Sequence, residues 1–262
     1  MAYLKDIYYT DNGPSNGPGF PPVIFIHGFF MDSRMFEKQT IYLQDKYRII
    51  CMDIRGFGRS HCAKSDFTLY DIANDIVKLA DHLKLSRFVI CGMSMGGYIA
   101  LRAYIRYPER ICGIILIGSQ AERDNEETIQ HYNFLSKHWE DINIRNNVIE
   151  QLLPIIVGKN KHDQNLWRAT WMSYDNENIK NAMYAMLTRD EIIHQIKKIT
   201  IPVLVIHGEH DLGIPVEAAI KLHSHLKYAR LAIIPQGAHA VNITHASMTN
   251  HLIKTWLEDY FR

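Results

Sequence analysis

The sequence has few of the features that mark disulfide-bonded, metal-binding or membrane-spanning proteins. It contains four cysteines in 262 residues, and no two of them form a CxxC pair, so a redox or metal site of that kind is not expected. Its first residues, MAYLKDIYYT, lack the apolar core of a secretory signal. No apolar run reaches the length of about 18 residues that a membrane span needs. We therefore expect a cytoplasmic protein with no membrane partner.

An excess of charge of one sign is also missing. The chain has 29 basic and 28 acidic residues, with a formal net charge of +1 and no long block of either sign. Because proteins that bind nucleic acid neutralise its phosphates with many basic residues, we expect no nucleic-acid partner. The hydrophobic content of 47% is enough for a large core. One α/β domain with an insertion suits this length better than two independent domains.

Short β-rich segments alternate with amphipathic segments along most of the chain, which is typical of a parallel sheet covered by helices. The expected strands are Val23–His27, Arg48–Asp53, Phe88–Cys91, Ile111–Ile117, Val203–His207 and Leu231–Ile234, with a further strand in DIYYTD near the N-terminus. Most of them are continuous apolar runs, as strands buried on both faces require. Apolar spacings of three and four predict a helix from Leu69 to Leu83, with Thr68 and Asp71 as its cap.

This alternation breaks between residues 119 and 200. The stretch has long helical patterns, three of the four tryptophans and no convincing strand. We predict a helical cap of residues 119–200, inserted into a core made of residues 1–118 and 201–262.

The segment CGMSMGGYIA places one serine, Ser94, among glycines at the end of a predicted strand. It fits the G-x-S-x-G pattern, in which a sharp strand-to-helix turn exposes a nucleophilic hydroxyl. The alternative is an ordinary tight turn that contains a serine. The strand before the segment and the helix after it favour the first interpretation.

A serine hydroxyl needs a base to take its proton, and the base needs an acid to orient it. In the chain order Ser, acid, His, the acid follows a late strand, where PVLVIHGEHDLGIP supplies Asp211. The base follows the last strand, where LAIIPQGAHAVN supplies His239. Glu209 and Asp190 are the alternative acids.

His207 and His210 flank the same segment and are spaced like a metal-binding pair. A third ligand is missing, so we expect no metal site. The chemistry of serine, histidine and aspartate needs no organic cofactor either.

The negatively charged oxygen that forms when a serine attacks an ester needs two N–H donors. We expect one of them to be the amide of Met95, directly after Ser94. The segment VIFIHGFF supplies the second, and we expect it to be the amide of Phe29. The neighbouring Phe30 is expected to line the substrate pocket.

Five motifs follow one another in the order HGFF, DIRGFGRS, GMSMGG, GEHD and GAHAVN. On these motifs the chain resembles the α/β-hydrolase superfamily over nearly its whole length. It is most similar to the cofactor-free branch of small carboxylesterases, enol-lactonases, pimeloyl-carrier-protein methyl esterases and bacterial perhydrolases. The resemblance implies an α/β fold with a mostly parallel, doubly wound sheet and a helical cap, and structural roles for Asp53, Arg55 and Ser60. Haloalkane dehalogenases and epoxide hydrolases are disfavoured. The resemblance implies that those two branches have an aspartate at the position that Ser94 occupies in this chain.

Large side chains of the insertion are expected to form an apolar pocket over the serine. The candidates for its lining are Trp139, Trp167 and Trp171. The basic residues of the insertion are interpreted as a solvated face, and the alternative is that they bind the phosphate of a carrier protein or a substrate carboxylate: Arg123, Arg145, Lys159, Lys161 and Arg168.

We therefore predict a serine-dependent hydrolase of carboxylic esters with small to medium acyl chains, in which Ser94, His239 and Asp211 form the catalytic triad. A lactone hydrolase, a carrier-protein methyl esterase or a perhydrolase would use the same residues. A ligand receptor on this fold is the alternative from another class. The expected partner is a small-molecule ester, and the sequence leaves open whether the chain forms a homo-oligomer.

Overall fold

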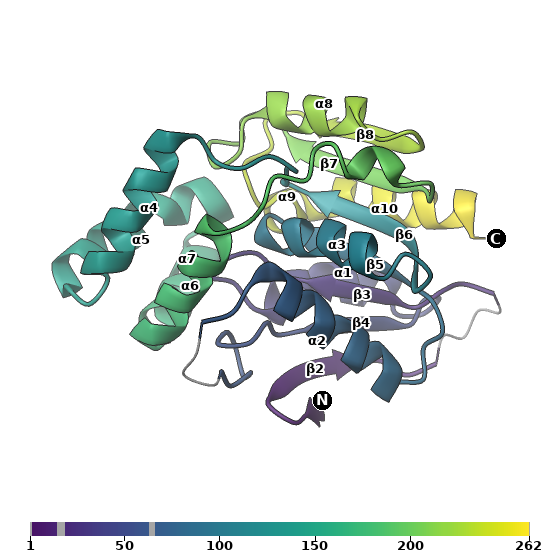
Figure 1. Cartoon of the computed structure of the whole chain (residues 1–262), viewed down its shortest axis with the longest axis horizontal. Coiled ribbons are helices and arrows are strands. Elements are labelled where there is room, and N and C mark those ends of the chain that lie inside the picture. Colours follow the sequence, from purple (N-terminus) through teal and green to yellow (C-terminus); the bar gives the residue numbers. More distant parts are fainter. Residues whose placement is uncertain (1, 15–18, 63–65, 262) are drawn as a thin grey trace.

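The centre of the molecule is an eight-stranded, mostly parallel sheet (Figure 1). The computed structural model describes residues 2–14, 19–62 and 66–261. In chain order the strands are β1 (Ala2–Leu4), β2 (Ile7–Asp11), β3 (Val23–Ile26), β4 (Ile49–Met52), β5 (Phe88–Met93), β6 (Ile111–Ile117), β7 (Val203–Gly208) and β8 (Ala229–Ile234). Their order in the sheet is β1-β2-β4-β3-β5-β6-β7-β8. The six strands from β3 to β8 run parallel, whereas β1 and β2 are antiparallel to their neighbours.

The predicted strands are all present, and the α/β fold with a mostly parallel sheet is confirmed. The observed ends differ from the predicted ones by at most two residues, and DIYYTD forms β2. Strand β1 was not predicted. It pairs with β2 through a tight turn in which Lys5 has a φ of 53°, a left-handed conformation for which a lysine gives no sequence signal.

Helices cover both faces of the sheet. Figure 1 shows α2 and α3 packed together in front of it, and α1 and α10 against one another behind it. The helices outside the predicted insertion are α1 (Glu37–Leu43), α2 (Leu69–His82), α3 (Met95–Arg106), α8 (Val216–Ser224), α9 (Val241–Thr244) and α10 (Ala246–Tyr260). The sheet is therefore buried on both sides, which explains the continuous apolar strands.

The start of α2 has the predicted cap. The Oγ of Thr68 accepts a hydrogen bond of 3.3 Å from the amide of Asp71, whose carboxylate accepts one of 2.8 Å from the amide of Thr68. Such a reciprocal pair satisfies two N–H groups that have no partner within the helix. Ile72, Ile76 and Leu79, on the apolar face of α2, are fully buried.

Between β6 and β7 the described chain is helical and contains no strand. The four α-helices here are α4 (Glu126–His138), α5 (Ile142–Val157), α6 (Lys161–Ser173) and α7 (Asn176–Leu187). Each of them begins after an Asn or Asp whose side chain accepts a backbone N–H, the usual N-cap. In Figure 1 these helices lie together to the left of the sheet.

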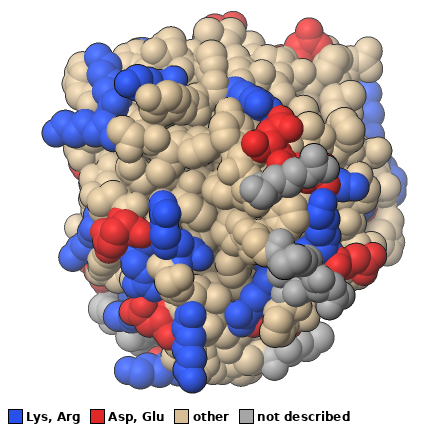
Figure 2. Space-filling view, turned by 90° about the vertical axis from the view of Figure 1, so that its right-hand side faces the viewer, with Lys and Arg blue, Asp and Glu red and all other residues tan. Residues whose placement is uncertain are grey.

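The surface carries charge of both signs. On the face seen in Figure 2, basic and acidic side chains lie close to one another around a broad area of other residues. Of the helices that the described residues form, none is long and apolar enough to cross a membrane.

Candidate active site

Ser94 lies in the turn between β5 and α3, where the backbone is strained. Its φ is 52° and its ψ is −116°, and a positive φ is uncommon for a residue with a side chain. Close approach of strand and helix requires glycine here. A Cβ on Gly92 would lie 2.1 Å from the carbonyl oxygen of Gly96, and one on Gly96 would lie 2.1 Å from that of Ile26. The turn presents the Ser94 hydroxyl to the loops that follow β7 and β8.

Three loops at the carboxyl edge of the sheet bring Ser94, His239 and Asp211 together. They follow β5, β8 and β7, and parallel strands all end at the same edge. The Oγ of Ser94 lies 3.0 Å from Nε2 of His239, and Nδ1 of His239 lies 2.7 Å from Oδ2 of Asp211. With its proton on Nδ1, the imidazole donates to the carboxylate and accepts from the hydroxyl. A base that takes the serine proton needs this arrangement.

The carboxylate of Asp211 is buried but well supplied with donors. Its Oδ1 accepts hydrogen bonds of 2.8 Å from the amide of Gly213 and 2.9 Å from that of Ile214. Burial by itself would raise the pKa of Asp211, but hydrogen bonds from His207 and His239 outweigh it and hold that pKa well below its usual range. Asp211 therefore stays ionised at neutral pH and can stabilise positive charge on the imidazole.

His207 is a second histidine on the same carboxylate oxygen. Its Nε2 lies 3.2 Å from Oδ2 of Asp211 and donates a hydrogen bond of 2.8 Å to the carbonyl oxygen of Ile214. The ring is fully buried, and its Nδ1 has no partner among the described residues. Nε2 of His207 carries a proton, because the carbonyl oxygen of Ile214 can only accept. His207 thus helps to hold Asp211 in place beside His239, a contact that the sequence pattern did not indicate.

Two backbone amides near Ser94 are free to donate. Within the described chain, neither the amide of Phe29 nor that of Met95 has a hydrogen-bond acceptor. Met95 is the first residue of α3, where an N–H group has no partner inside the helix and faces outward. These are the two donors predicted for an oxyanion.

The loop that carries Phe29 is held by a buried histidine. Nδ1 of His27 contacts the carbonyl oxygen of Gly28 at 2.8 Å, and Nε2 accepts a 2.9 Å hydrogen bond from the amide of Ile54. Burial lowers the pKa of His27, although the charge of Asp53 opposes this. The ring is therefore neutral at pH 7, with one nitrogen donating and the other accepting.

The alternative acids lie elsewhere. Glu209 has an exposed side chain that accepts from the amide of Gln236, and Asp190 pairs with Arg102. The side chain of His210 is exposed and lies 3.9 Å from the carboxylate of Glu209. Among the described residues, no group of three or more His, Cys, Asp and Glu side chains is arranged to hold a metal ion.

The DIRGFGRS segment stabilises the loops around the site through hydrogen bonds and an ion pair. Asp53 accepts a 2.7 Å hydrogen bond from the amide of Ser33, and the Oγ of Ser60 donates one of 2.7 Å to the carbonyl oxygen of Asp53. Arg55 forms an ion pair of 2.6 Å with Asp75 of α2. These contacts tie the loop after β4 to its neighbours.

A cavity of about 110 Å³ adjoins Ser94 and His239. It is bounded by the loop at Gly28–Met31, by α5 and by α4, so it lies between the sheet edge and the inserted helices. Pockets for drug-sized ligands measure about 300–1,000 Å³. The space beside Ser94 therefore suits a small group.

Phe30 lines this cavity as expected, but the three tryptophans do not. Trp139 and Trp171 are fully buried, and their rings lie on that of Phe30 with centroids 5.2 Å apart in both pairs. They pack behind Phe30 rather than beside the substrate space. Trp167 faces a separate groove, where the guanidinium of Arg34 lies 5.5 Å from its ring centre. Sequence composition indicated large side chains in the insertion but not the direction in which each one points.

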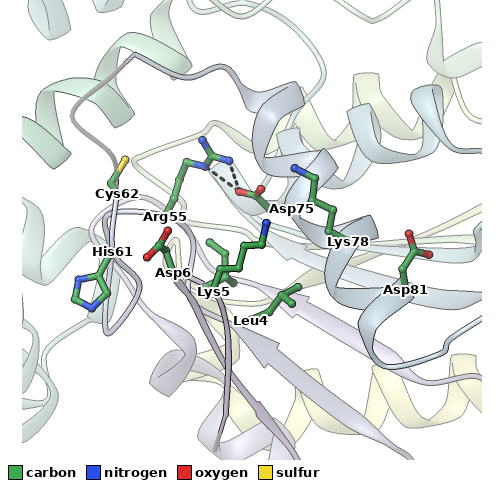
Figure 3. A pocket seen from close by; sticks show the side chains of 10 residues that line it. Leu4, Lys5, Asp6, Arg55, His61, Cys62, Asp75, Lys78 and Asp81 are labelled. Atoms are coloured by element: carbon green, nitrogen blue, oxygen red, sulfur yellow. Dashed lines mark hydrogen bonds and ion pairs between the residues drawn. The ribbon is translucent and has the colours of Figure 1, made fainter.

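A larger cavity, of about 350 Å³, lies away from Ser94 (Figure 3). It is formed by β1, β2, the loop after β4 and α2, and the ion pair of Arg55 and Asp75 lies in its wall. Lys5, Lys78 and Asp6 also face it, so the wall has charges of both signs. None of Ser94, Asp211 and His239 lines this cavity.

The chain resembles known proteins along nearly all of its length. It is 28% identical to an uncharacterised hydrolase, YugF, of Bacillus subtilis, over 90% of this chain and 88% of that protein. It is 26% identical to 3-oxoadipate enol-lactonase 2 of Acinetobacter baylyi, over 92% and 90% of the two chains.

A solved structure shares the whole architecture. A thermophilic esterase from Thermogutta terrifontis superposes with a TM-score of 0.89 at 25% identity, covering 98% of this chain and 94% of the other. The model of the α/β hydrolase fold family matches residues 21–246, which include all three loops of the candidate site. With this match and the parallel sheet described above, the chain belongs to the α/β hydrolase fold family.

Proposed function

We propose that this hydrolase cleaves carboxylic esters with short acyl groups through an acyl-enzyme on Ser94. One observation carries the proposal: a continuous series of contacts runs from Oγ of Ser94 through His239 to Asp211. The amides of Phe29 and Met95, which have no acceptor among the described residues, support it.

In the first half of the reaction, Oγ of Ser94 attacks the carbonyl carbon while Nε2 of His239 accepts the hydroxyl proton. The electron pair of the C=O bond moves to oxygen, and the amides of Phe29 and Met95 stabilise this charge. The tetrahedral intermediate then breaks its bond to the alkoxy group. That group takes the proton from the imidazolium and leaves as an alcohol, with the acyl group on Ser94.

In the second half, water gives a proton to Nε2 of His239 and attacks the acyl carbon. The bond to Oγ of Ser94 breaks, the oxygen recovers the proton, and the carboxylic acid leaves. Asp211 keeps the imidazole in the tautomer that accepts at Nε2 and stabilises its positive charge in both halves.

The acyl-chain range follows from the cavity. Its volume of about 110 Å³ and the apolar side chains of Phe30, Leu152 and Ile156 suit a short apolar chain. Each methylene that is buried contributes about 0.8 kcal/mol, or roughly fourfold in kcat/KM, until the space is full. We expect kcat/KM to rise over the shortest p-nitrophenyl esters and to fall toward decanoate.

The test combines covalent labelling with turnover. A fluorophosphonate should label the wild-type protein at Ser94, and Ser94→Ala should lose both labelling and at least about a thousandfold of kcat. Ser224→Ala, which changes an exposed serine on α8, is the matched control and should resemble the wild type. Undiminished turnover in Ser94→Ala would overturn the proposal. A single turnover with every ester offered would favour a ligand receptor instead.

Lactones are the second substrate class, because the Acinetobacter baylyi relative is named an enol-lactonase. A lactone is a cyclic ester, so the same steps would open its ring and leave the alcohol on the product. Comparing kcat/KM for a five-membered lactone and its open-chain methyl ester separates the two classes in one assay.

A further inference from the structure

The cavity beside Ser94 has two chemically different walls. The apolar wall includes Phe29, Phe30 and Ile156. Four other lining residues carry polar groups and are here called the polar wall: Tyr98, Asp124, Thr128 and Tyr132. These four residues come from α3, from α4 and from the loop between β6 and α4. An alkyl chain has no polar atom with which the groups of the polar wall could form a hydrogen bond.

The only carboxylate of the polar wall is neutralised by a buried arginine. Arg189 forms two contacts of 2.8 Å with Asp124, one to each carboxylate oxygen. Its guanidinium lies 4.6 Å from the centre of the Tyr98 ring, and its side chain is 3% exposed. The pair therefore has no net charge, and the arginine is too enclosed to meet a substrate directly.

Hydrogen-bonding capacity remains on the polar wall after these contacts. Oδ1 of Asp124 accepts from Arg189 and, at 3.1 Å, from Gln120, while Oδ2 accepts from Arg189. Since an ionised carboxylate has about four acceptor positions, one is left. In the part of the chain that the structure describes, neither the hydroxyl of Tyr132 nor that of Thr128 has a hydrogen-bond partner.

The two tyrosines of the polar wall keep their protons. Burial raises the pKa of Tyr98, and it does the same for Tyr132, where the charge of Asp124 adds to the effect. Both phenols are therefore O–H donors at neutral pH. The wall offers donors beside a partly used acceptor, and a substrate hydroxyl matches both because it accepts and donates.

We infer that the polar wall recognises a neutral hydroxyl group on the substrate, so that the preferred substrates are short hydroxyacyl esters. This inference rests on the proposed ester hydrolysis at Ser94. The hydroxyl would accept a hydrogen bond from Tyr132 and donate one to Asp124. A substrate carboxylate at the same place would lose its hydrating water without gaining a cation, because Arg189 is already paired with Asp124, and would be disfavoured.

The first experiment compares three substrates of similar size: methyl butyrate, methyl 3-hydroxybutyrate and monomethyl succinate. A hydrogen bond to a neutral partner is worth about 1 kcal/mol, which corresponds to roughly fivefold in kcat/KM. We expect the hydroxy ester to exceed methyl butyrate by about that factor and monomethyl succinate to be the poorest. A higher kcat/KM for methyl butyrate than for the hydroxy ester, or a preference for the succinate, would overturn the inference.

The second experiment assigns the preference to the polar wall. Tyr132→Phe removes only the hydroxyl, so the ratio of kcat/KM for the hydroxy ester to that for methyl butyrate should fall by about fivefold. Tyr184→Phe is the matched control, because Tyr184 is exposed on the neighbouring α7. Its ratio should equal that of the wild type. An unchanged ratio in Tyr132→Phe contradicts recognition by this residue.

The two proposals fail in different ways. If Ser94→Ala retains turnover of methyl butyrate, the ester mechanism is wrong whatever the substrate ratio. If Ser94→Ala is inactive but the ratio of the two butyrate esters favours the apolar substrate, the mechanism holds and the role of the polar wall is wrong.

Discussion

The carboxyl edge of the sheet and the inserted helices α4–α7 build the candidate site by different means. At the edge, Ser94, Asp211 and His239 are positioned by backbone: strand ends, a strained turn and close contacts between glycines and carbonyl groups. The helices contribute Tyr132, Leu152 and other side chains, whose placement depends on packing. A backbone turn can be altered little without losing its geometry, whereas packed side chains can be exchanged. We therefore expect changes at the edge to abolish the reaction and changes in the helices to alter its substrates.

Replacing His239, the proposed base, should have the largest effect. In His239→Ala no group takes the proton of Ser94, so kcat for a p-nitrophenyl ester should fall by at least about a thousandfold. His210→Ala changes an exposed histidine near the same edge and serves as the control. Full activity in His239→Ala would show that another group is the base.

Asp211→Asn should come next. An asparagine has no negative charge to stabilise the imidazolium, and it does not hold His239 in the tautomer that accepts at Nε2, which costs up to about ten-thousandfold in kcat in a related triad. We expect a loss of at least about a hundredfold in kcat. Glu209→Gln, which changes the acid two residues before Asp211, is the matched control. If Glu209→Gln is the inactive variant, Glu209 is the acid and Asp211 is not.

His207→Phe tests a residue that acts only through Asp211, because phenylalanine fills the space but has no N–H donor. Loss of the contact with Asp211 should reduce kcat by at least about tenfold, since a hydrogen bond to a charged group is worth about 1.5–3 kcal/mol. KM should stay near the wild-type value, because His207 is sealed from the substrate space. An increase in KM with unchanged kcat would mean that the change has distorted the cavity instead.

In the helices the expected effect is one of specificity. Leu152→Ala on α5 enlarges the cavity, so kcat/KM for longer acyl chains should rise severalfold relative to butyrate, at about 0.8 kcal/mol for each further buried methylene. Leu166→Ala, on the exposed side of α6, is the control. A loss of all activity in Leu152→Ala, with the fold intact, would contradict the expectation that the helices determine the choice of substrate and the sheet edge the reaction.

The smallest effect concerns stability in acid. Because the folded-state pKa of His27 lies below the ordinary value of 6.5, the unfolded chain binds the proton more readily. The free energy of unfolding should therefore decrease as the pH falls below about 6.5, by at most about 1.4 kcal/mol per pH unit from this residue. Urea titrations from pH 7 to pH 5 should show a flatter dependence in His27→Gln, and exposed His194→Gln should leave the slope unchanged. An equal slope in all three proteins would exclude His27 as the cause.

The same division separates what the sequence predicts well from what it does not. The ends of β5, β7 and β8 follow from apolar runs, and the structure brings together the residues expected at those ends because parallel strands share an edge. The tryptophans of the insertion were expected in the pocket, yet Trp139 and Trp171 pack behind Phe30. Which way a helix faces depends on contacts among residues far apart in the chain, and the apolar pattern alone does not determine it.

The contact of His207 with Asp211 could not be predicted from the sequence for a different reason. Its spacing to His210 resembles a metal-binding pair, but a residue in a parallel strand and one in the following turn face different surroundings. The signal that would have found its contact with Asp211 is the separation of four residues across a tight turn, with Gly208 between them. That signal becomes specific only when the strand end is known.

The packing of Trp139 and Trp171 against Phe30 has a consequence for exchanging parts between relatives. Phe30 has a φ of 64° and directly follows the amide proposed to stabilise the oxyanion, so the two indole rings fix the conformation of that loop. Helices α4 and α6 are therefore not a removable module. A chimera that receives these helices from another hydrolase would keep its triad but lose the support of Phe30, unless the donor also supplies two flat rings at the same places.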